Sequence, residues 1–255
     1  MDFFIVSYPK SGRTWLRFML INYLQRHFGL EIDPSIIDPT ALSKLNSKIP
    51  RIMVTHAGGD VLEMYPGDLK NLFSKFKNKN IVLLVRDPRD VLVSSYFHKT
   101  KRANIENKTP YKKTISEFIK EERGSLATYL EFHKLWYEMK PLMKKILLIK
   151  YENLHKEPVN EMKKILEFFG IKNPDNPKIK DAISFAQFEN MRKMEINESI
   201  KSKQLKAGKK DDFESYKTRR GETGAYKDYL NNDEILYINK KVEEAMPNWY
   251  EYKNQ

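Results

Sequence analysis

Short apolar runs and longer amphipathic stretches alternate along the first two thirds of the chain. The runs are rich in aliphatic and β-branched residues, as is typical of strands buried on both faces, and they lie at residues 3–6, 51–55, 80–85 and 146–149. Between and after them, apolar residues recur at helical spacing over residues 14–24, 68–76, 91–99, 115–120, 126–139 and 159–169. Strands that alternate with helices predict an α/β protein with a central parallel sheet flanked by helices.

The last third of the chain has a weaker pattern and is predicted to be helical or irregular. Residues 199–224 carry many charges and no apolar periodicity, and we expect them to form an exposed loop. No linker rich in glycine, serine or proline divides the sequence, and 255 residues are enough for one substantial core. We therefore predict a single domain over residues 1–255.

The absence of cysteine limits the chemistry that the chain can use. It excludes disulfides and thiolate metal ligands, and it fits a reducing compartment. The five histidines show no metal-ligand spacing, and no apolar stretch is long enough to cross a bilayer or to form a cleavable leader. We expect a cytoplasmic protein without a transmembrane segment or a bound metal.

The net charge of +12 favours anionic partners. Such partners include nucleotides, acidic glycans, nucleic acid and membrane surfaces. Because Lys, Asn and Ile are abundant throughout the chain, charge alone does not choose among them.

The loop between the first strand and the first helix, YPKSGRTW at residues 8–15, combines proline, glycine and hydroxyl residues. It joins a buried strand directly to a buried helix. Such a junction directs several backbone N–H groups and a helix N-terminus at one point, which is a favourable site for an anion. Lys10 adds a full positive charge, and the loop is therefore predicted to bind phosphate.

Chemically distinctive residues follow two further strands. His56 comes directly after the strand at 51–55 and could act as a general base. Arg86 follows the strand at 80–85, Asp87 or Asp90 could cap the next helix, and Ser94 lies one or two turns into it. Because ligands of doubly wound sheets bind beyond the carboxyl ends of the strands, we expect one site with two anion-binding parts.

The phosphate loop differs from that of common nucleotide hydrolases. It lacks the spacing GxxxxGK[ST], and no acidic residue is obviously placed to bind magnesium. These differences disfavour an ordinary kinase or ATPase.

Three segments, in order, resemble motifs of the sulfotransferases that use 3'-phosphoadenosine 5'-phosphosulfate (PAPS). YPKSGRTW resembles their 5'-phosphosulfate loop, RDPRDVLVS at residues 86–94 their 3'-phosphate segment, and RRGETGAYKDYL at residues 219–230 their carboxyl-terminal motif. The resemblance covers nearly the whole chain. It implies a P-loop-like architecture of the sulfotransferase and nucleoside-kinase type. It also implies transfer of a sulfonate group from PAPS to a hydroxyl or amine, with 3',5'-ADP (PAP) as the product.

The resemblance further implies which residues hold the donor. The 5'-phosphosulfate contacts are Lys10, Ser11, Gly12, Arg13 and Thr14; the 3'-phosphate contacts are Arg86, Ser94, Arg219, Arg220 and Gly221; and the adenine contacts are Trp15, Tyr151 and Phe188. Lysine suits the first group as a compact point charge, and arginine suits the second because it grips a phosphate through two donors. No metal is implied.

Two residues are implied to be catalytic. The segment VTHAGG resembles the part of these enzymes whose histidine takes the acceptor proton, which makes His56 the implied general base. Lys10 is implied to stabilise the charge that develops on the leaving phosphate.

Four positions depart from the family pattern. Arg13 stands where threonine is usual and adds positive charge where the sulfonate or the 5'-phosphate is expected. Ala225 and Tyr226 replace aspartate and tryptophan, and Val54 replaces a lysine that often precedes the histidine by two residues. A second catalytic lysine is therefore not expected at residue 54.

Two other functions remain open from the sequence: a nucleotide-dependent phosphotransferase, and a non-catalytic basic protein that binds nucleic acid. The spacing of the phosphate loop and the second basic segment count against the first. A phosphate loop buried between core elements, and a basic run at residues 199–220 without interleaved aromatic residues, count against the second. We therefore expect no nucleic-acid partner.

The acceptor is predicted only by class, as a small molecule or as a glycan or lipid-linked group. Acceptor pockets are built from loops, and loops carry no readable substrate code. The candidate loops are residues 58–66, 99–113 and 199–217, of which the last two are basic. The sequence does not indicate an oligomeric state.

Overall fold

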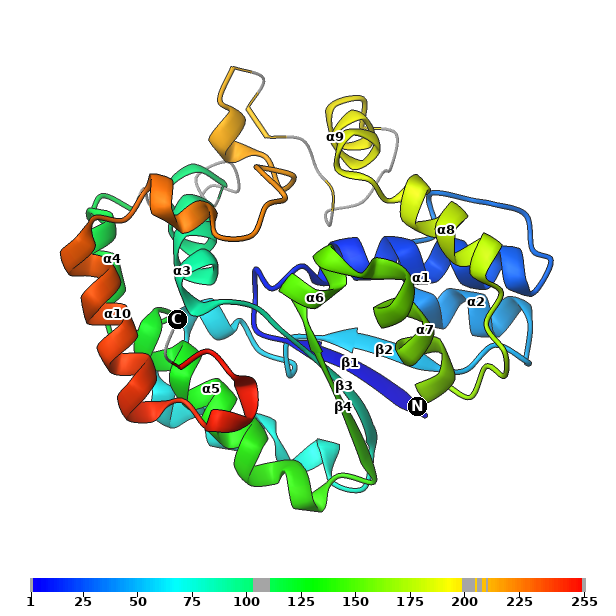
Figure 1. The fold of residues 1–255 in the computed structure, drawn as a ribbon, viewed down its shortest axis with the longest axis horizontal. Helices are drawn as coiled ribbons and strands as arrows, with labels where there is room; N and C mark the ends of the chain where they lie inside the picture. The colour runs from blue at the N-terminus through cyan, green and yellow to red at the C-terminus, as the bar shows by residue number, and fades with distance from the viewer. Residues whose placement is uncertain (1, 103–110, 199–204, 206–207, 210, 254–255) are drawn as a thin grey trace.

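Four parallel strands form the sheet at the centre of the molecule (Figure 1). In this computed structural model, which describes residues 2–102, 111–198, 205, 208–209 and 211–253, they are β1 (Phe3–Ser7), β2 (Ile52–Thr55), β3 (Asn80–Val85) and β4 (Lys145–Lys150). Their order is β2-β1-β3-β4, with Ile5 paired to Val54 on one side and to Val82 on the other. All four predicted strands are confirmed.

The order of the strands determines where a ligand can bind. The chain leaves β1 to form β2 at one edge, and then crosses to the other side of β1 to form β3. The connections that follow β1 and β3 therefore diverge. In open α/β sheets such divergence leaves a crevice at the carboxyl ends of the two strands.

Helices cover both faces of the sheet (Figure 1). The side chain of Ile5 packs into the apolar cluster on one face, whereas its neighbours Phe4 and Val6 pack into the cluster on the other. Burial on both faces explains why the strands have no polar side. The first face carries α1 (Arg13–His27), α2 (Pro39–Leu45), α7 (Pro158–Phe168) and α8 (Asn176–Phe185), and the second carries α3 (Pro88–Phe97), α4 (Ile115–Lys120), α5 (Leu126–Met139) and α10 (Asn232–Ala245).

Shorter elements connect these layers. They are α6 (Tyr151–Lys156), α9 (Phe188–Ile196), the π-helical turn η4 (His98–Arg102), and the 3-10 helices η1 (Val61–Glu63), η2 (Pro66–Leu72), η3 (Ser74–Phe76), η6 (Lys140–Leu142), η8 (Phe213–Ser215), η9 (Ala225–Asp228) and η10 (Asn248–Tyr250). None of the described helices has both the length and the apolar character that a membrane span requires.

The predicted helices are largely confirmed, and those at 115–120 and 126–139 have the predicted bounds. The helix predicted from residue 91 begins at Pro88, because a side-chain oxygen of Asp87 accepts a hydrogen bond of 2.8 Å from the backbone N–H of Arg89. Asp87 is therefore the N-cap, one of the two candidates that the sequence offered.

One helix prediction was wrong in type, and two short helices were missed. Residues 68–76 form the 3-10 helices η2 and η3, because buried Leu69, Phe73 and Phe76, spaced four and three residues apart, fit either kind of helix. Helices α2 and α6 contain only seven and six residues, which is too short to establish a helical period.

The prediction that residues 199–224 form an exposed loop was wrong for its second half, where Ser215, Tyr216 and Thr218 are buried. Glu195, which has no exposed surface, explains this burial. Its carboxylate accepts hydrogen bonds from the backbone N–H groups of Lys217 (2.7 Å) and Thr218 (2.8 Å). The chain is thereby held against α9. Within this segment, residues 199–204, 206–207 and 210 lie outside the described residues.

Candidate active site

A cavity of about 640 Å³ opens at the carboxyl ends of β1 and β3. Its wall combines the loop after β1, the residue after β2, the start of α3 and the segment that follows η8. Every predicted site residue except Ser11 lines it: Lys10, Gly12, Arg13, Thr14, Trp15, His56, Arg86, Ser94, Tyr151, Phe188, Arg219, Arg220 and Gly221. The fold therefore gathers residues from six separate parts of the sequence around one space: 10–15, 56, 86–94, 151, 188 and 219–221.

The loop after β1 has the backbone conformation of an anion-binding nest. Lys10 (φ 70°) and Gly12 (φ 88°) both adopt left-handed angles, and Gly12 is the N-cap of α1. Such alternation turns successive backbone N–H groups toward one side. No described side chain caps α1, and its first turn contains no acidic residue. Its N-terminal N–H groups and dipole therefore favour an anion at this place.

Ser11 is the exception among the predicted residues. Its side chain is fully buried, it does not line the cavity, and its Oγ has no hydrogen-bond partner within the described chain. The Ser11 side chain is therefore not part of the cavity wall.

Three aromatic side chains surround glycines of two loops. A Cβ atom at Gly12 would overlap the ring of Tyr151, which packs edge-on against Trp15 with 5.6 Å between the ring centroids. At Gly221 (φ 71°) a Cβ atom would lie 2.5 Å from the ring of Phe188. Glycine is thus required at both positions by conformation and by close approach. The three predicted adenine contacts are brought together around them.

Arg86 lies at the centre of the second basic region. Its guanidinium stacks 4.3 Å above the ring of Tyr151 and donates hydrogen bonds to the carbonyl oxygens of Lys10 (3.3 Å) and Glu222 (2.8 Å). Its Nε is buried and has no partner in the described chain. These contacts hold the guanidinium in place at the cavity wall.

Asp90, the other capping candidate, has a different role from the one that the sequence suggested. Its carboxylate lies 3.5 Å from Arg86 and accepts hydrogen bonds from the backbone N–H groups of Gly224 (2.8 Å) and Tyr226 (3.0 Å). Because Asp90 is almost fully buried, these bonds are shielded from water. Asp90 therefore positions the carboxyl-terminal motif beside Arg86.

The two neighbouring arginines of that motif differ in their surroundings. Arg219 lies between the rings of Phe97 (4.6 Å) and Tyr229 (4.9 Å) and pairs with Glu214 at 3.0 Å. Arg220 is more exposed and pairs with Asp228 at 2.6 Å. Arg219 is therefore the more buried of the two.

His56 has a defined tautomer. Its Nδ1 lies 2.9 Å from the carbonyl oxygen of Ser7, which can only accept a hydrogen bond. Nδ1 therefore carries the proton, and Nε2 of the neutral ring has a free lone pair. Burial, and then the charge of Arg13, lowers the pKa of His56 well below its ordinary value. At neutral pH the ring is consequently a neutral proton acceptor.

Lys10 is also perturbed by its surroundings. Burial, and then the positive charges of Arg102 and Arg219, lowers the pKa of Lys10 to about 7. Without an anion nearby, the side chain is therefore close to half protonated at neutral pH. An anionic ligand would favour the charged form.

The sequence analysis missed several residues of the wall. Lys217 and Arg102 line the cavity, and Glu195 holds the Arg102 guanidinium at 3.2 Å. Burial, and then the charges of Lys10 and Arg102, lowers the pKa of Lys217 far below its ordinary value. Only the position of Lys217, two residues before the carboxyl-terminal motif, could have marked it in the sequence.

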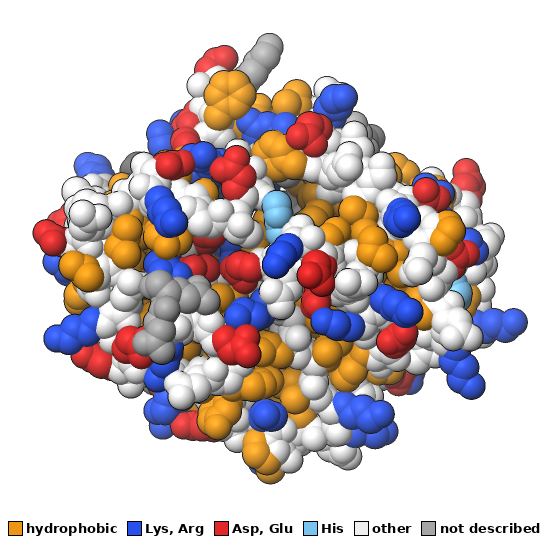
Figure 2. All heavy atoms as spheres, viewed as in Figure 1, with side chains coloured by type: hydrophobic (Ala, Val, Ile, Leu, Met, Phe, Trp, Pro, Cys, Tyr) orange, Lys and Arg blue, Asp and Glu red, His pale blue; other side chains and the backbone are white. Residues whose placement is uncertain are grey.

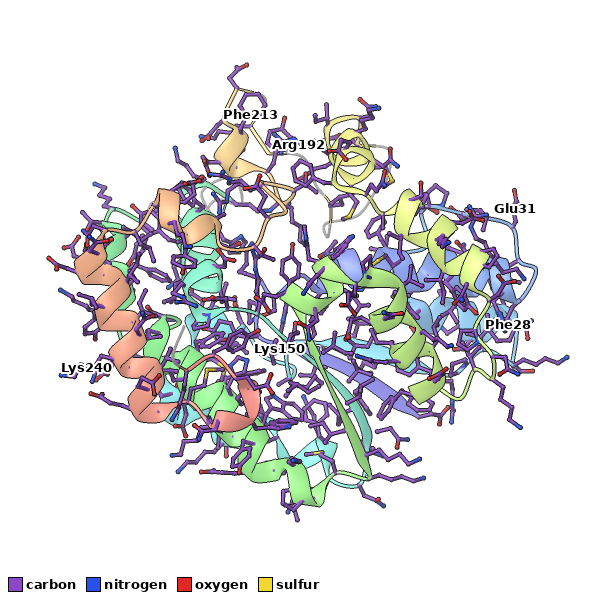
Figure 3. All side chains as sticks on the ribbon, in the orientation of Figure 1. Phe28, Glu31, Lys150, Arg192, Phe213 and Lys240 are labelled. Atoms are coloured by element: carbon purple, nitrogen blue, oxygen red, sulfur yellow. The ribbon has the colours of Figure 1, made fainter. Side chains whose placement is uncertain are left out.

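The segment after η8 and helix α9 face each other above the sheet, where Figure 3 shows Arg192 next to Phe213. The Arg192 guanidinium also lies 3.7 Å from the ring of Tyr216 and donates a hydrogen bond of 2.9 Å to the carbonyl oxygen of Thr218. These contacts connect the two sides of the cavity mouth. Nowhere in the described ranges do three His, Cys, Asp or Glu side chains form a group that could hold a metal ion.

The chain matches the family model described as "Sulfotransferase domain" over residues 1–250. It is 27% identical over 271 residues to flavonol 3-sulfotransferase from Flaveria bidentis, covering 96% of this chain and 81% of that protein. It is 27% identical over 267 residues to cytosolic sulfotransferase 12 from Arabidopsis thaliana, covering 95% and 76%. A crystal structure of a mouse sulfotransferase complexed with PAP is similar with a TM-score of 0.60 at 26% identity, covering 97% of this chain and 85% of that one.

These similarities agree with the order of the three sequence motifs and with the cavity that they line. The predicted P-loop-like α/β fold of the sulfotransferase type is confirmed. The chain belongs to the sulfotransferase domain family and is a PAPS-dependent sulfotransferase.

Proposed function

We propose that the protein transfers the sulfonate group of PAPS to a hydroxyl or amine of its acceptor, with His56 as general base and Lys10 at the leaving phosphate. The observation that carries this proposal is that the Lys10 loop, the Arg86 region and His56 line one cavity of about 640 Å³. A donor with anionic groups at both ends of a nucleoside requires two basic regions. In-line transfer also requires a proton acceptor near one of them.

The residues of the cavity fit this donor. The nest formed by the N–H groups of residues 10–14 would hold the 5'-phosphate, because its backbone conformation suits an anion. The guanidinium of Arg86, which lines the cavity, would donate to the 3'-phosphate. Further contacts to the 3'-phosphate are assigned to Ser94, Arg219, Arg220 and Gly221, and stacking on the adenine to Trp15, Tyr151 and Phe188.

His56 would remove the proton of the acceptor. The hydrogen bond from Nδ1 to Ser7 keeps Nε2 unprotonated, and the lowered pKa keeps the ring neutral before transfer. As the bond from the acceptor oxygen to sulfur forms and the bond from sulfur to the phosphate oxygen breaks, the proton passes to Nε2. The leaving phosphate retains the electron pair.

Lys10 would stabilise that leaving phosphate. Its pKa of about 7 in the ligand-free protein lets a bound anion convert it to the fully charged form. Its interaction with the phosphate then strengthens as negative charge develops in the transition state. We propose that this charge takes the place of a metal ion.

We further infer one domain over residues 1–255, a cytoplasmic location and a small-molecule acceptor rather than a nucleic acid. The family match over residues 1–250 and the names of two relatives, a flavonol sulfotransferase and a cytosolic sulfotransferase, support these inferences. On the face shown in Figure 2, Lys and Arg side chains are interspersed with Asp and Glu. A nucleic-acid binder more often presents one continuous basic surface.

Calorimetric titration of the whole protein in EDTA tests the proposed donor site. We expect 3',5'-ADP to bind at least 10-fold more tightly than 5'-AMP, because only the former reaches both basic regions. A transfer assay with PAPS and a panel of phenols and alcohols tests the reaction itself. Equal affinity for 3',5'-ADP and 5'-AMP would contradict the proposed 3'-phosphate site. Nucleotide binding that appears only when Mg²⁺ is added would favour a phosphotransferase.

A further inference from the structure

The cavity wall contains positively charged side chains that the proposed donor contacts do not use, because the donor loop is proposed to bind through its backbone N–H groups. Arg13, the first residue of α1, and Lys217 line the cavity together with His56. Arg17 follows Arg13 by one turn of α1, and its side chain is buried. Arg17 lies behind the wall, whereas Arg13 and Lys217 come from parts of the wall other than the Arg86 region, so the 3'-phosphate does not account for them.

The same side chains lie close enough to influence one another. Burial, and then the charge of Arg17, lowers the pKa of Arg13 to about 9. After burial, Arg13 has the largest effect on the lowered pKa of His56, and Lys217 lowers it further. Lys217 is affected in turn by both arginines. The positive charge is therefore concentrated around the proposed general base.

The carboxylates of Asp60 and Glu222 also line the cavity. Arg13 forms no ion pair with any part of the chain that the structure describes, and the acidic influence on Arg17 comes from Asp38, the N-cap of α2. Glu195 accepts hydrogen bonds from the Arg102 guanidinium and from backbone N–H groups. A guanidinium held away from water without an ionic partner is unfavourable. Arg13 is therefore suited to receive an anion.

The wall beside His56 also has an apolar part. Val61 and Leu62 line the cavity a few residues beyond His56, and Met191 and Leu205 line it from α9 and the segment after it. A molecule bound here meets apolar surface, positive charge and the proposed base together.

We propose that Arg13 and Lys217 form an anion-binding subsite for the acceptor, which is an alcohol or phenol that carries a carboxylate, phosphate or sulfate group. This inference rests on the proposed function, because it assigns the hydroxyl of that acceptor to His56. The backbone N–H of Arg13 remains part of the donor loop, while its guanidinium binds the anionic group of the acceptor. A guanidinium suits this task because its two parallel N–H donors match two oxygens of such a group.

The test compares two phenols of the same shape, 4-hydroxybenzoate and 4-hydroxybenzamide, which differ in charge. Calorimetry measures the binding of each to the whole protein, both free and saturated with 3',5'-ADP, and a transfer assay measures KM for each. We expect the benzoate to bind at least about 10-fold more tightly, as for one hydrogen bond between charged groups. 4-Hydroxyphenyl phosphate, as a third phenol, distinguishes a phosphate from a carboxylate preference.

Substitutions then locate the source of this preference. Arg13→Thr and, independently, Lys217→Met should reduce the ratio of the two dissociation constants to below about 3-fold. Arg26→Thr is the matched control, because Arg26 lies on the same helix and pairs with Asp181 at 3.3 Å outside the cavity wall. It should keep the preference. Melting curves confirm that each variant is folded, and either cavity variant alone is sufficient for the test.

Each outcome has a definite meaning. Equal binding of the benzoate and the benzamide by the unmodified protein would overturn the inference. So would a preference that survives in both cavity variants while their affinity for 3',5'-ADP falls, since both side chains would then serve the donor. A preference that depends on Arg13, combined with no sulfonate transfer to any phenol, would support the anion subsite and contradict the proposed function.

Discussion

Nucleotide binding should change the protonation state of Lys10. Burial, and then the charges of Arg102 and Arg219, lowers the pKa of Lys10 from 10.5 to about 7 in the ligand-free protein. A bound 5'-phosphate places negative charge beside the ammonium and should raise this pKa again. Binding of 3',5'-ADP at pH 8 should therefore be accompanied by the uptake of a proton.

The size of the effect follows from the pKa. With a pKa of about 7, Lys10 is charged in about one half of the molecules at pH 7, about one tenth at pH 8 and about one hundredth at pH 9. If it is charged in nearly every complex, binding at pH 8 takes up about 0.9 proton. Because binding selects the charged form, the apparent affinity should fall about 50-fold from pH 7 to pH 9.

The lowered pKa of Lys10 also makes the stability of the folded protein depend on pH. The folded pKa of Lys10 lies below its unfolded value, so the unfolded chain binds more protons between about pH 7 and pH 10. The Lys10 contribution should therefore make the ligand-free protein more stable as the pH rises through this window. Bound nucleotide should abolish this contribution, because it returns the pKa toward the unfolded value.

Calorimetric titrations at pH 8 in Tris and in HEPES measure the proton uptake, because the two buffers have different ionisation enthalpies. Lys10→Met should remove the part of the uptake that belongs to Lys10. Lys241→Met is the control, since Lys241 is exposed on α10 and pairs with Glu244 at 2.7 Å. Identical heats in both buffers, or an affinity that does not change between pH 7 and pH 9, would refute the reasoning for Lys10.

Three further changes test the geometry of the site. Gly12→Ala should reduce 3',5'-ADP affinity by at least 10-fold, because its Cβ would overlap the ring of Tyr151 and its backbone would be strained. Gly29→Ala is the control: Gly29 also has a positive φ, but an added Cβ there would have no atom within 4 Å, so this variant should bind 3',5'-ADP normally. Arg86→Ala should weaken 3',5'-ADP binding by about 1.5 to 3 kcal/mol and leave 5'-AMP binding nearly unchanged. An equal loss of affinity for both nucleotides would contradict the proposed contact between Arg86 and the 3'-phosphate. Glu195→Gln should lower the free energy of unfolding in urea by up to about 3 to 5 kcal/mol, because it removes a buried negative charge that pairs with the Arg102 guanidinium. A loss no larger than that of Glu189→Gln on the same helix would contradict this role.

The sequence revealed the frame of the site because its signals are local. A buried strand that runs into Gly12 and a helix predicts an anion site from a few adjacent residues, and in the structure Gly12 is the N-cap of the helix that follows β1. Arg86 and His56 were found for the same reason, because each directly follows a buried strand. Parallel strands bring these ends to one edge of the sheet.

Residues that act through tertiary contacts were not readable from the sequence. Glu195 is one of many charged residues on a short polar helix, and its buried bonds to Arg102 and to the backbone of Thr218 depend on chain segments far away in the sequence. Asp90 resembled a helix cap and instead holds the backbone of Gly224, 134 residues later. A sequence segment with many charged residues predicts an exposed loop, and a buried partner such as Glu195 cannot be identified from the sequence. The burial of Ser215 and Thr218 was missed for this reason.

The central claim is that His56 removes the acceptor proton during sulfonate transfer, and single-turnover transfer from PAPS by His56→Asn tests it most directly. Asparagine can still donate a hydrogen bond to the carbonyl oxygen of Ser7 but cannot accept the acceptor's proton. The variant therefore keeps the hydrogen bond that holds residue 56 and removes only the proposed base. We expect 3',5'-ADP affinity and melting temperature to remain nearly unchanged, and the rate of transfer at neutral pH to fall by about 100-fold or more. His27→Asn, at the far end of α1, should keep the full rate. A His56→Asn protein that transfers sulfonate at the unmodified rate would contradict the assignment of His56 as the base.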